Sequence, residues 1–106
     1  MLQKQEIMEK ILKLLYEVQK EMSAKINLTK NKIAEIEAEI DKRNDFYESK
    51  SDKWKDSDKD TEYSEKTEEL EDEKSELEDL LDEFIDFLSD IDDKVQFAHD
   101  YIFQKE

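Results

Sequence analysis

The acidic side chains in the second half of this chain are the first candidates for chemistry. Six residues follow the spacing of the ligand positions in a calcium-binding loop: Asp58, Asp60, Glu62, Ser64, Lys66 and Glu69. The sixth position of such a loop needs glycine for a sharp turn but holds Tyr63, and the ninth holds the cation Lys66. We therefore expect no calcium site, and we expect no other metal ion or cofactor.

The chain also lacks the side chains that enzymes usually use for catalysis. The chain has no cysteine and one histidine, His99, whose neighbours Asp92 and Gln96 do not form the Glu-x-x-His pattern of a metal site in a helical bundle. Acid pairs are abundant, but on an outward helix face water keeps both members ionised and unsuited to acid catalysis. We predict that the protein is not an enzyme.

The acids instead form a regular row along the second half of the chain. Nine of them, which we call the acidic row, alternate steps of four and three: Glu65, Glu69, Asp72, Glu76, Asp79, Glu83, Asp86, Asp90 and Asp93. Each follows a position of the apolar seam described below by two residues, or about 200° around a helix, so the row should lie opposite the core. Residues 58–106 hold 20 acidic and 5 basic side chains, a balance of -15, whereas residues 1–57 hold 12 of each.

This charge distribution predicts a basic partner. From Glu62 to Asp93, 16 acids and 2 lysines share roughly 48 Å of helix, or about one carboxylate per 3 Å, close to the one phosphate per about 3.4 Å of a DNA strand. Nucleic acid itself would be repelled. We predict a binding protein whose acidic row docks on a basic protein surface, as a nucleic-acid mimic that inhibits a host nucleic-acid-binding or defence protein. The alternatives are a merely solvated face, a scaffolding coiled coil and a secreted effector.

The elements that position these side chains are helices. The chain has no glycine and no proline, so it lacks the usual turn residues of a sheet protein. Twelve positions of the second half alternate steps of four and three as a heptad seam: Tyr63, Thr67, Leu70, Lys74, Leu77, Leu81, Phe84, Leu88, Ile91, Val95, Ala98 and Ile102. The first half has a second such seam: Met8, Ile11, Leu15, Val18, Met22, Ile26, Thr29, Ile33, Ile36, Ile40, Arg43, Tyr47, Lys50 and Trp54.

These seams predict an all-α fold, a single-domain, long antiparallel helical hairpin of coiled-coil type over residues 1–106. We expect helices over about residues 2–56 and 61–105, with the tip at about residues 55–61. Folding there sets Trp54 against Tyr63 and Arg43 opposite Lys74. Two successive steps of four, Val18 to Met22 to Ile26, indicate a stutter, and the segment from Asn27 to Asn31 is a candidate break that would give three helices.

Apolar side chains exceed what one seam needs at the end opposite the tip. The surplus residues that we expect to join two copies as a homodimer, here called the base residues, are Ile7, Leu14, Leu80, Phe87 and Tyr101. Alternatively, a break at the candidate segment would create a third helix, and that helix would cover these apolar residues. No apolar run approaches the roughly 18 residues of a membrane span, so we expect no membrane contact and a cytoplasmic location, in a host cell if the chain is phage-encoded.

The tip segment resembles a stretch of small uncharacterised phage and plasmid helical-hairpin proteins, Ser-x-Lys-Trp-x-x-Ser-x-Lys-Gly followed by Tyr. The matching residues are Ser51, Lys53, Trp54, Ser57, Lys59 and Tyr63. Asp60 stands where that pattern has glycine, and the match covers under a fifth of the chain. The resemblance implies a mobile-element origin and carries no activity. At the tip, Trp54 either packs on Tyr63 or serves as an exposed anchor for a partner.

Overall fold

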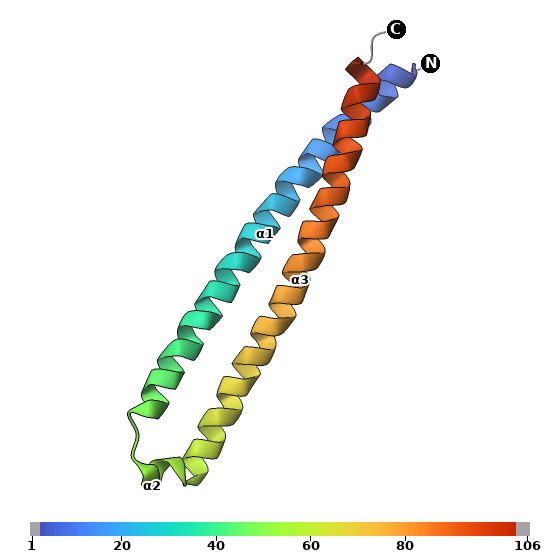
Figure 1. Cartoon of the computed structure of the whole chain (residues 1–106). Helices are drawn as coiled ribbons and strands as arrows, with labels where there is room; N and C mark the ends of the chain where they lie inside the picture. Colours follow the sequence, from blue (N-terminus) through green and yellow to red (C-terminus); the bar gives the residue numbers. More distant parts are fainter. Residues whose placement is uncertain (1–2, 104–106) are drawn as a thin grey trace. The chain divides into compact units, whose positions relative to one another are not determined.

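The fold is an all-α antiparallel helical hairpin, as the two seams predict (Figure 1). The computed structural model describes residues 3–103. Helix α1 spans Lys4–Glu48, the short helix α2 spans Asp52–Lys55, and α3 spans Asp58–Phe103. Every described residue has a negative φ, which fits a chain without glycine.

The contacts divide the chain into two compact units. Among the described residues, unit 1 holds residues 3–28 and 82–103, and unit 2 holds residues 29–81 with α2. In unit 2, Arg43 of α1 bonds to Thr67 of α3, and Glu37 of α1 pairs with Lys74 of α3, so the two helices run in opposite directions. In unit 1, Gln19 of α1 donates to Asp92 of α3.

The seam of α3 is confirmed along its whole length. All twelve predicted positions are buried or half-buried, with Ile91 and Ala98 buried most fully. The seam of α1 is confirmed with two changes, because Leu12 is buried where Ile11 was expected and the half-buried Gln19 joins the seam between Leu15 and Met22. Val18 and Gln19 are both half-buried at the predicted stutter, so the α1 seam widens there to two adjacent residues.

The predicted break near Asn27–Asn31 is wrong, because α1 continues through this segment. Asparagine costs a helix only a few tenths of a kcal/mol relative to better helix formers. Ile26 in unit 1 and Thr29 and Ile33 in unit 2 are all buried. Packing against α3 therefore outweighs the weak local preference, and no third long helix forms at this point.

The tip begins earlier than predicted, because α1 ends at Glu48 rather than near residue 56. Ser49 donates its hydroxyl to the carbonyl oxygen of Phe46, and the Ser51 hydroxyl accepts from the backbone N–H of Trp54 as the N-cap of α2. These two serines replace backbone hydrogen bonds lost where the helix stops. They allow the chain to fold back and to bring Trp54 onto the end of α1.

The pairing of the helices differs from the predicted register by one heptad. Arg43 was expected opposite Lys74, but it bonds to Thr67, which lies 74 minus 67, or seven, residues earlier. Lys74 instead pairs with Glu37, with 3.2 Å between its Nζ and the carboxylate Oε1. The observed register gives each cation a polar partner on the facing helix, whereas the predicted one would set two cations against each other.

Candidate functional site

The acidic row lies on the outward side of α3 and all nine of its residues are exposed. Five of them, Glu65 to Asp79, belong to unit 2, and the four from Glu83 to Asp93 belong to unit 1. Within residues 3–103 the structure pairs one member of the row with a lysine, Glu69 with Lys66 on the same helix, at 3.5 Å and with both side chains well exposed. An exposed pair of this kind contributes little. The row is therefore a set of carboxylates available to a partner.

The tip is an aromatic cluster built by α1, α2 and α3. The ring of Trp54 lies 5.7 Å from that of Tyr63, which confirms the predicted contact, and 5.9 Å from that of Tyr47. Phe46 joins the cluster, 6.0 Å from Trp54 and 5.1 Å from Tyr63. Sequence reasoning missed Phe46 because it lies outside the seam. The only signal was an aromatic residue next to Tyr47 at a helix end.

Cations cover the rings of this cluster. The Nζ of Lys50 lies 4.1 Å from the centre of the Phe46 ring, and that of Lys55 lies 5.1 Å from the Tyr47 ring. Trp54 is half-buried. The cluster packs Trp54 against neighbouring rings, which favours a structural role for that residue.

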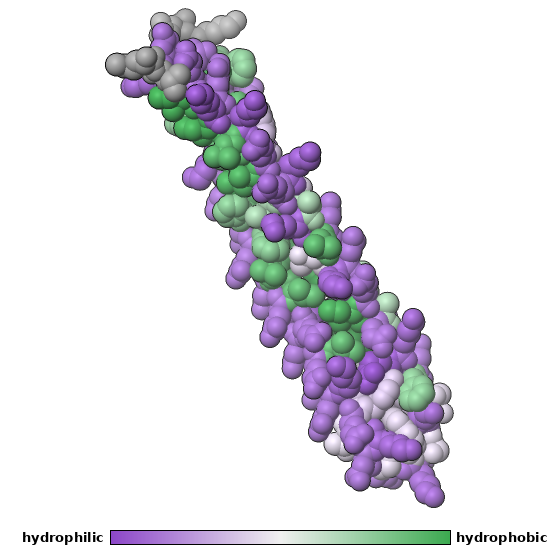
Figure 2. Space-filling model, turned by 180° about the vertical axis from the view of Figure 1, so that it is seen from behind, coloured by the Kyte–Doolittle hydropathy of each residue, from purple (hydrophilic) through white to green (hydrophobic). Residues whose placement is uncertain are grey.

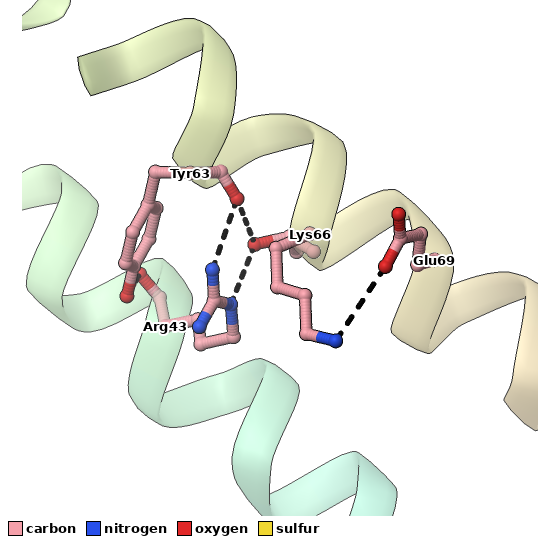
Figure 3. A network of polar contacts seen from close by, with 5 residues as sticks. Arg43, Tyr63, Lys66 and Glu69 are labelled. Atoms are coloured by element: carbon pink, nitrogen blue, oxygen red, sulfur yellow. Dashed lines mark hydrogen bonds and ion pairs between the residues drawn. The ribbon is translucent and has the colours of Figure 1, made fainter.

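Arg43 ties the tip to the seam of unit 2 (Figure 3). Its Nε donates to the hydroxyl of Thr67 at 2.9 Å, and its Nη2 donates to the carbonyl oxygen of Tyr63 at 3.0 Å. The guanidinium also lies 4.0 Å from the centre of the Tyr63 ring, whose hydroxyl donates back to the carbonyl oxygen of Arg43. A planar fork with several donors suits this combination of bonds, and lysine would not reproduce it.

The raised pKa values of two side chains in unit 2, Lys74 and Tyr47, predict a loss of stability at high pH. The hydrogen bond that Lys74 donates to the carboxylate of Glu37 raises the pKa of Lys74 above its ordinary value of 10.5. Burial lowers this pKa, and the nearby charges of Glu37, Glu78 and Asp41 raise it further. Burial raises the pKa of Tyr47 above 10.0, with smaller contributions from Asp60 and Asp56.

Both of these pKa values are raised in the folded state. Their contribution to stability is therefore complete below the unfolded-state pKa and is lost as the pH rises through the folded-state pKa. We expect the melting temperature to fall between about pH 10 and about pH 12, measured by circular dichroism. The Lys74→Gln and Tyr47→Phe variants together should flatten this fall. An equally steep fall in the double variant would contradict the assignment to these two groups.

The base residues are all exposed, as the surplus of apolar positions predicts. Four of them lie in unit 1, namely Ile7, Leu14, Phe87 and Tyr101. The fifth, Leu80, lies in unit 2. Phe97, which belongs to the same surplus of apolar residues in the sequence, and Ile11 are also exposed in unit 1. Ile11 had been placed in the seam, which Leu12 occupies instead.

No protein-family model, curated protein or solved structure matches this chain. The resemblance of the tip to phage and plasmid proteins therefore stays a prediction.

The described part of the chain has neither a metal-binding cluster nor a helix that could span a membrane. Residues 3–103 contain no group of three or more acidic, histidine or cysteine side chains placed to hold a metal ion, and the residues with calcium-loop spacing lie on the continuous helix α3. None of the helices in this range is both long enough and apolar enough to cross a membrane.

Proposed function

We propose that this chain is a non-enzymatic binding protein whose acidic row docks on a basic protein surface. The supporting observation is the row itself, nine exposed carboxylates in regular steps with one weak lysine pair among them. Like charges three and four residues apart each cost a helix a few tenths of a kcal/mol. A basic partner would offset that cost by supplying the missing cations.

The class of partner follows from charge and spacing. A net charge of -15 repels nucleic acid, so the partner is a protein with a basic surface. The carboxylates of α3 follow one another at about the axial spacing of phosphates along one DNA strand. We therefore propose a nucleic-acid mimic, encoded by a phage or plasmid, that inhibits a nucleic-acid-binding or defence protein in the cytoplasm of its host.

The test neutralises part of the row in unit 2. A triple variant removes three charges from the exposed side of α3 and leaves the seam unchanged: Asp72→Asn, Glu76→Gln and Asp79→Asn. We expect this triple variant to lose capture of the partner from a host lysate and to keep the helical circular dichroism spectrum. Salt of a few tenths molar should release the partner from the unmodified chain, because the Debye length shortens from about 10 Å at 0.1 M. Added duplex DNA should compete with the chain for the partner.

The matched control removes three exposed acids from the other side of the same helix segment. The control variant changes Glu68, Glu71 and Glu78 to Gln. Its net charge is -15 plus 3, or -12, the same as that of the first triple variant. This control should keep its partner. Equal capture by both triple variants, at an affinity that salt does not change, would reject the mimic and leave the tip or the apolar residues of unit 1 as the binding surface.

A further inference from the structure

Unit 1 exposes its apolar side chains mainly on one side of the seam. A groove of about 530 Å³ on that side is lined by Met8, Ile11 and Leu15 of α1, and by five residues of α3: Asp90, Asp93, Lys94, Phe97 and Ala98. Hydrophobic surface interrupts the hydrophilic surface near the chain ends in Figure 2. The groove is open and apolar at its floor, with carboxylates along the α3 edge.

Helical spacing places further exposed apolar residues on the same side. Ile7 and Leu14 lie one turn before and after Ile11, and Phe87 and Tyr101 lie one heptad before and after Lys94. We call the exposed set the groove face: Ile7, Ile11, Leu14, Phe87, Phe97 and Tyr101. The opposite side of the seam in unit 1 exposes fewer such residues, Tyr16, Ile85 and Phe103. An apolar patch this concentrated marks an interaction surface.

The spacing of the groove face indicates a helical occupant. Ile7, Ile11, Leu14 and the half-buried Val18 repeat the steps of four, three and four that a facing helix requires. Both α1 and α3 contribute to the face, so one helix would leave part of it uncovered. A partner with two antiparallel helices and the same heptad spacing would cover it, and a second copy of this chain has such a face.

Charge selects how two copies would meet. The α1 segment of residues 4–28 holds five lysines and four acids, a balance of +1, whereas the α3 segment of residues 82–103 holds seven acids and one lysine, a balance of -6. Packing α3 against α3 would set two acidic segments together. Packing α1 of one copy against α3 of the other sets the weakly basic segment against the acidic one. A membrane surface is disfavoured, because anionic lipid would repel the acidic edge.

We propose that a second copy of this chain covers the groove face, with α1 of each copy packed against α3 of the other, so that unit 1 forms half of a four-helix bundle. The two copies are related by a two-fold axis along the bundle, which makes every pair of neighbouring helices antiparallel. The acidic row of each copy then borders the interface along α3. This assembly does not require the basic partner proposed above, although Asp90 and Asp93 of the acidic row line the groove that the second copy covers.

The first test measures mass with a matched pair of variants on α3. Phe87 is 46% exposed and belongs to the groove face, whereas Ile85 is 43% exposed and lies on the opposite side of the seam. Sedimentation equilibrium should give a dimer for the unmodified chain. We expect Phe87→Glu to raise the dimer dissociation constant about 100-fold, whereas Ile85→Glu should leave it nearly unchanged, with both variants helical by circular dichroism. A monomer at all micromolar concentrations, or equal weakening by both variants, would overturn the proposal.

The second test identifies the neighbouring helices and uses the absence of cysteine from the chain. Leu14→Cys and Phe97→Cys place single thiols on the two sides of the groove face. A mixture of the two variants, oxidised with glutathione disulfide, should give mainly the mixed α1 to α3 cross-link. Cross-links formed chiefly between two Phe97 positions, or none at all in a dimer, would overturn the pairing of α1 with α3.

Discussion

Replacing Ile26 with aspartate is expected to cause the largest loss of stability of any single change considered for this chain. Ile26 is 7% exposed and lies in the α1 seam within unit 1. The change removes a buried side chain worth about 1.5 to 3 kcal/mol and adds a carboxylate that would be desolvated without a cation. We expect a total loss of about 3 to 5 kcal/mol, a large part of the roughly 5 to 15 kcal/mol that stabilises a domain. Urea denaturation followed by circular dichroism measures it.

The matched control is Leu28→Asp, two residues further along α1. Leu28 is 67% exposed, so the same residue type is introduced into the same helix without burial. The penalty from helix propensity is similar at both positions. The control should therefore lose no more than about 0.5 to 1 kcal/mol. Similar losses at both positions would mean that the burial of Ile26 against α3 contributes little, and would contradict the seam.

Changing Arg43 to alanine should give the next largest loss of stability. The change removes two hydrogen bonds from a cation, to Thr67 and to the Tyr63 carbonyl, together with the stacking on the Tyr63 ring. These interactions are not additive, and we expect a combined loss of about 2 to 3 kcal/mol. Arg43→Lys should recover only part of this, because lysine lacks the planar fork.

The fluorescence of Trp54, the single tryptophan, gives an independent readout of the same change. Trp54 contacts Tyr63, the residue on which Arg43 stacks, so loosening of this network should shift the emission to longer wavelength at constant helicity. The control is Lys42→Ala, which removes the neighbouring, exposed cation of α1 and should change stability by no more than about 0.5 kcal/mol. An equal effect of the two alanine variants would show that general charge, rather than the Arg43 contacts, stabilises the tip.

The exposed face of α3 and the apolar face of unit 1 give this chain two different surfaces. The acidic row is an electrostatic surface whose binding should weaken with salt. The groove face is apolar and should be much less sensitive to salt. Measuring dimer mass and partner capture over the same salt series would separate the two proposals, because each could fail without the other.

The sequence by itself determined the fold class, both seams in outline and the exposure of the acidic row. These features depend on local periodicity, since steps of four and three place side chains on one side of a helix whatever that helix packs against. The complete α3 seam was predictable for this reason. In α1, Ile11 and Leu12 are adjacent and both apolar, so periodicity alone did not decide which one is buried. Packing against α3 selected Leu12 and placed Gln19 in the seam, where it bonds to Asp92.

The tertiary structure alone decided the register and the tip. A heptad seam matches itself after a shift of seven residues, so the apolar pattern does not distinguish Arg43 opposite Lys74 from Arg43 opposite Thr67. The length of the connection and the contacts of Arg43 with the tip made the choice. Phe46 lies outside the seam, and its place in the aromatic cluster depends on α1 ending at Glu48 and on Trp54 folding back. Such contacts between distant residues have no periodic signal in the chain.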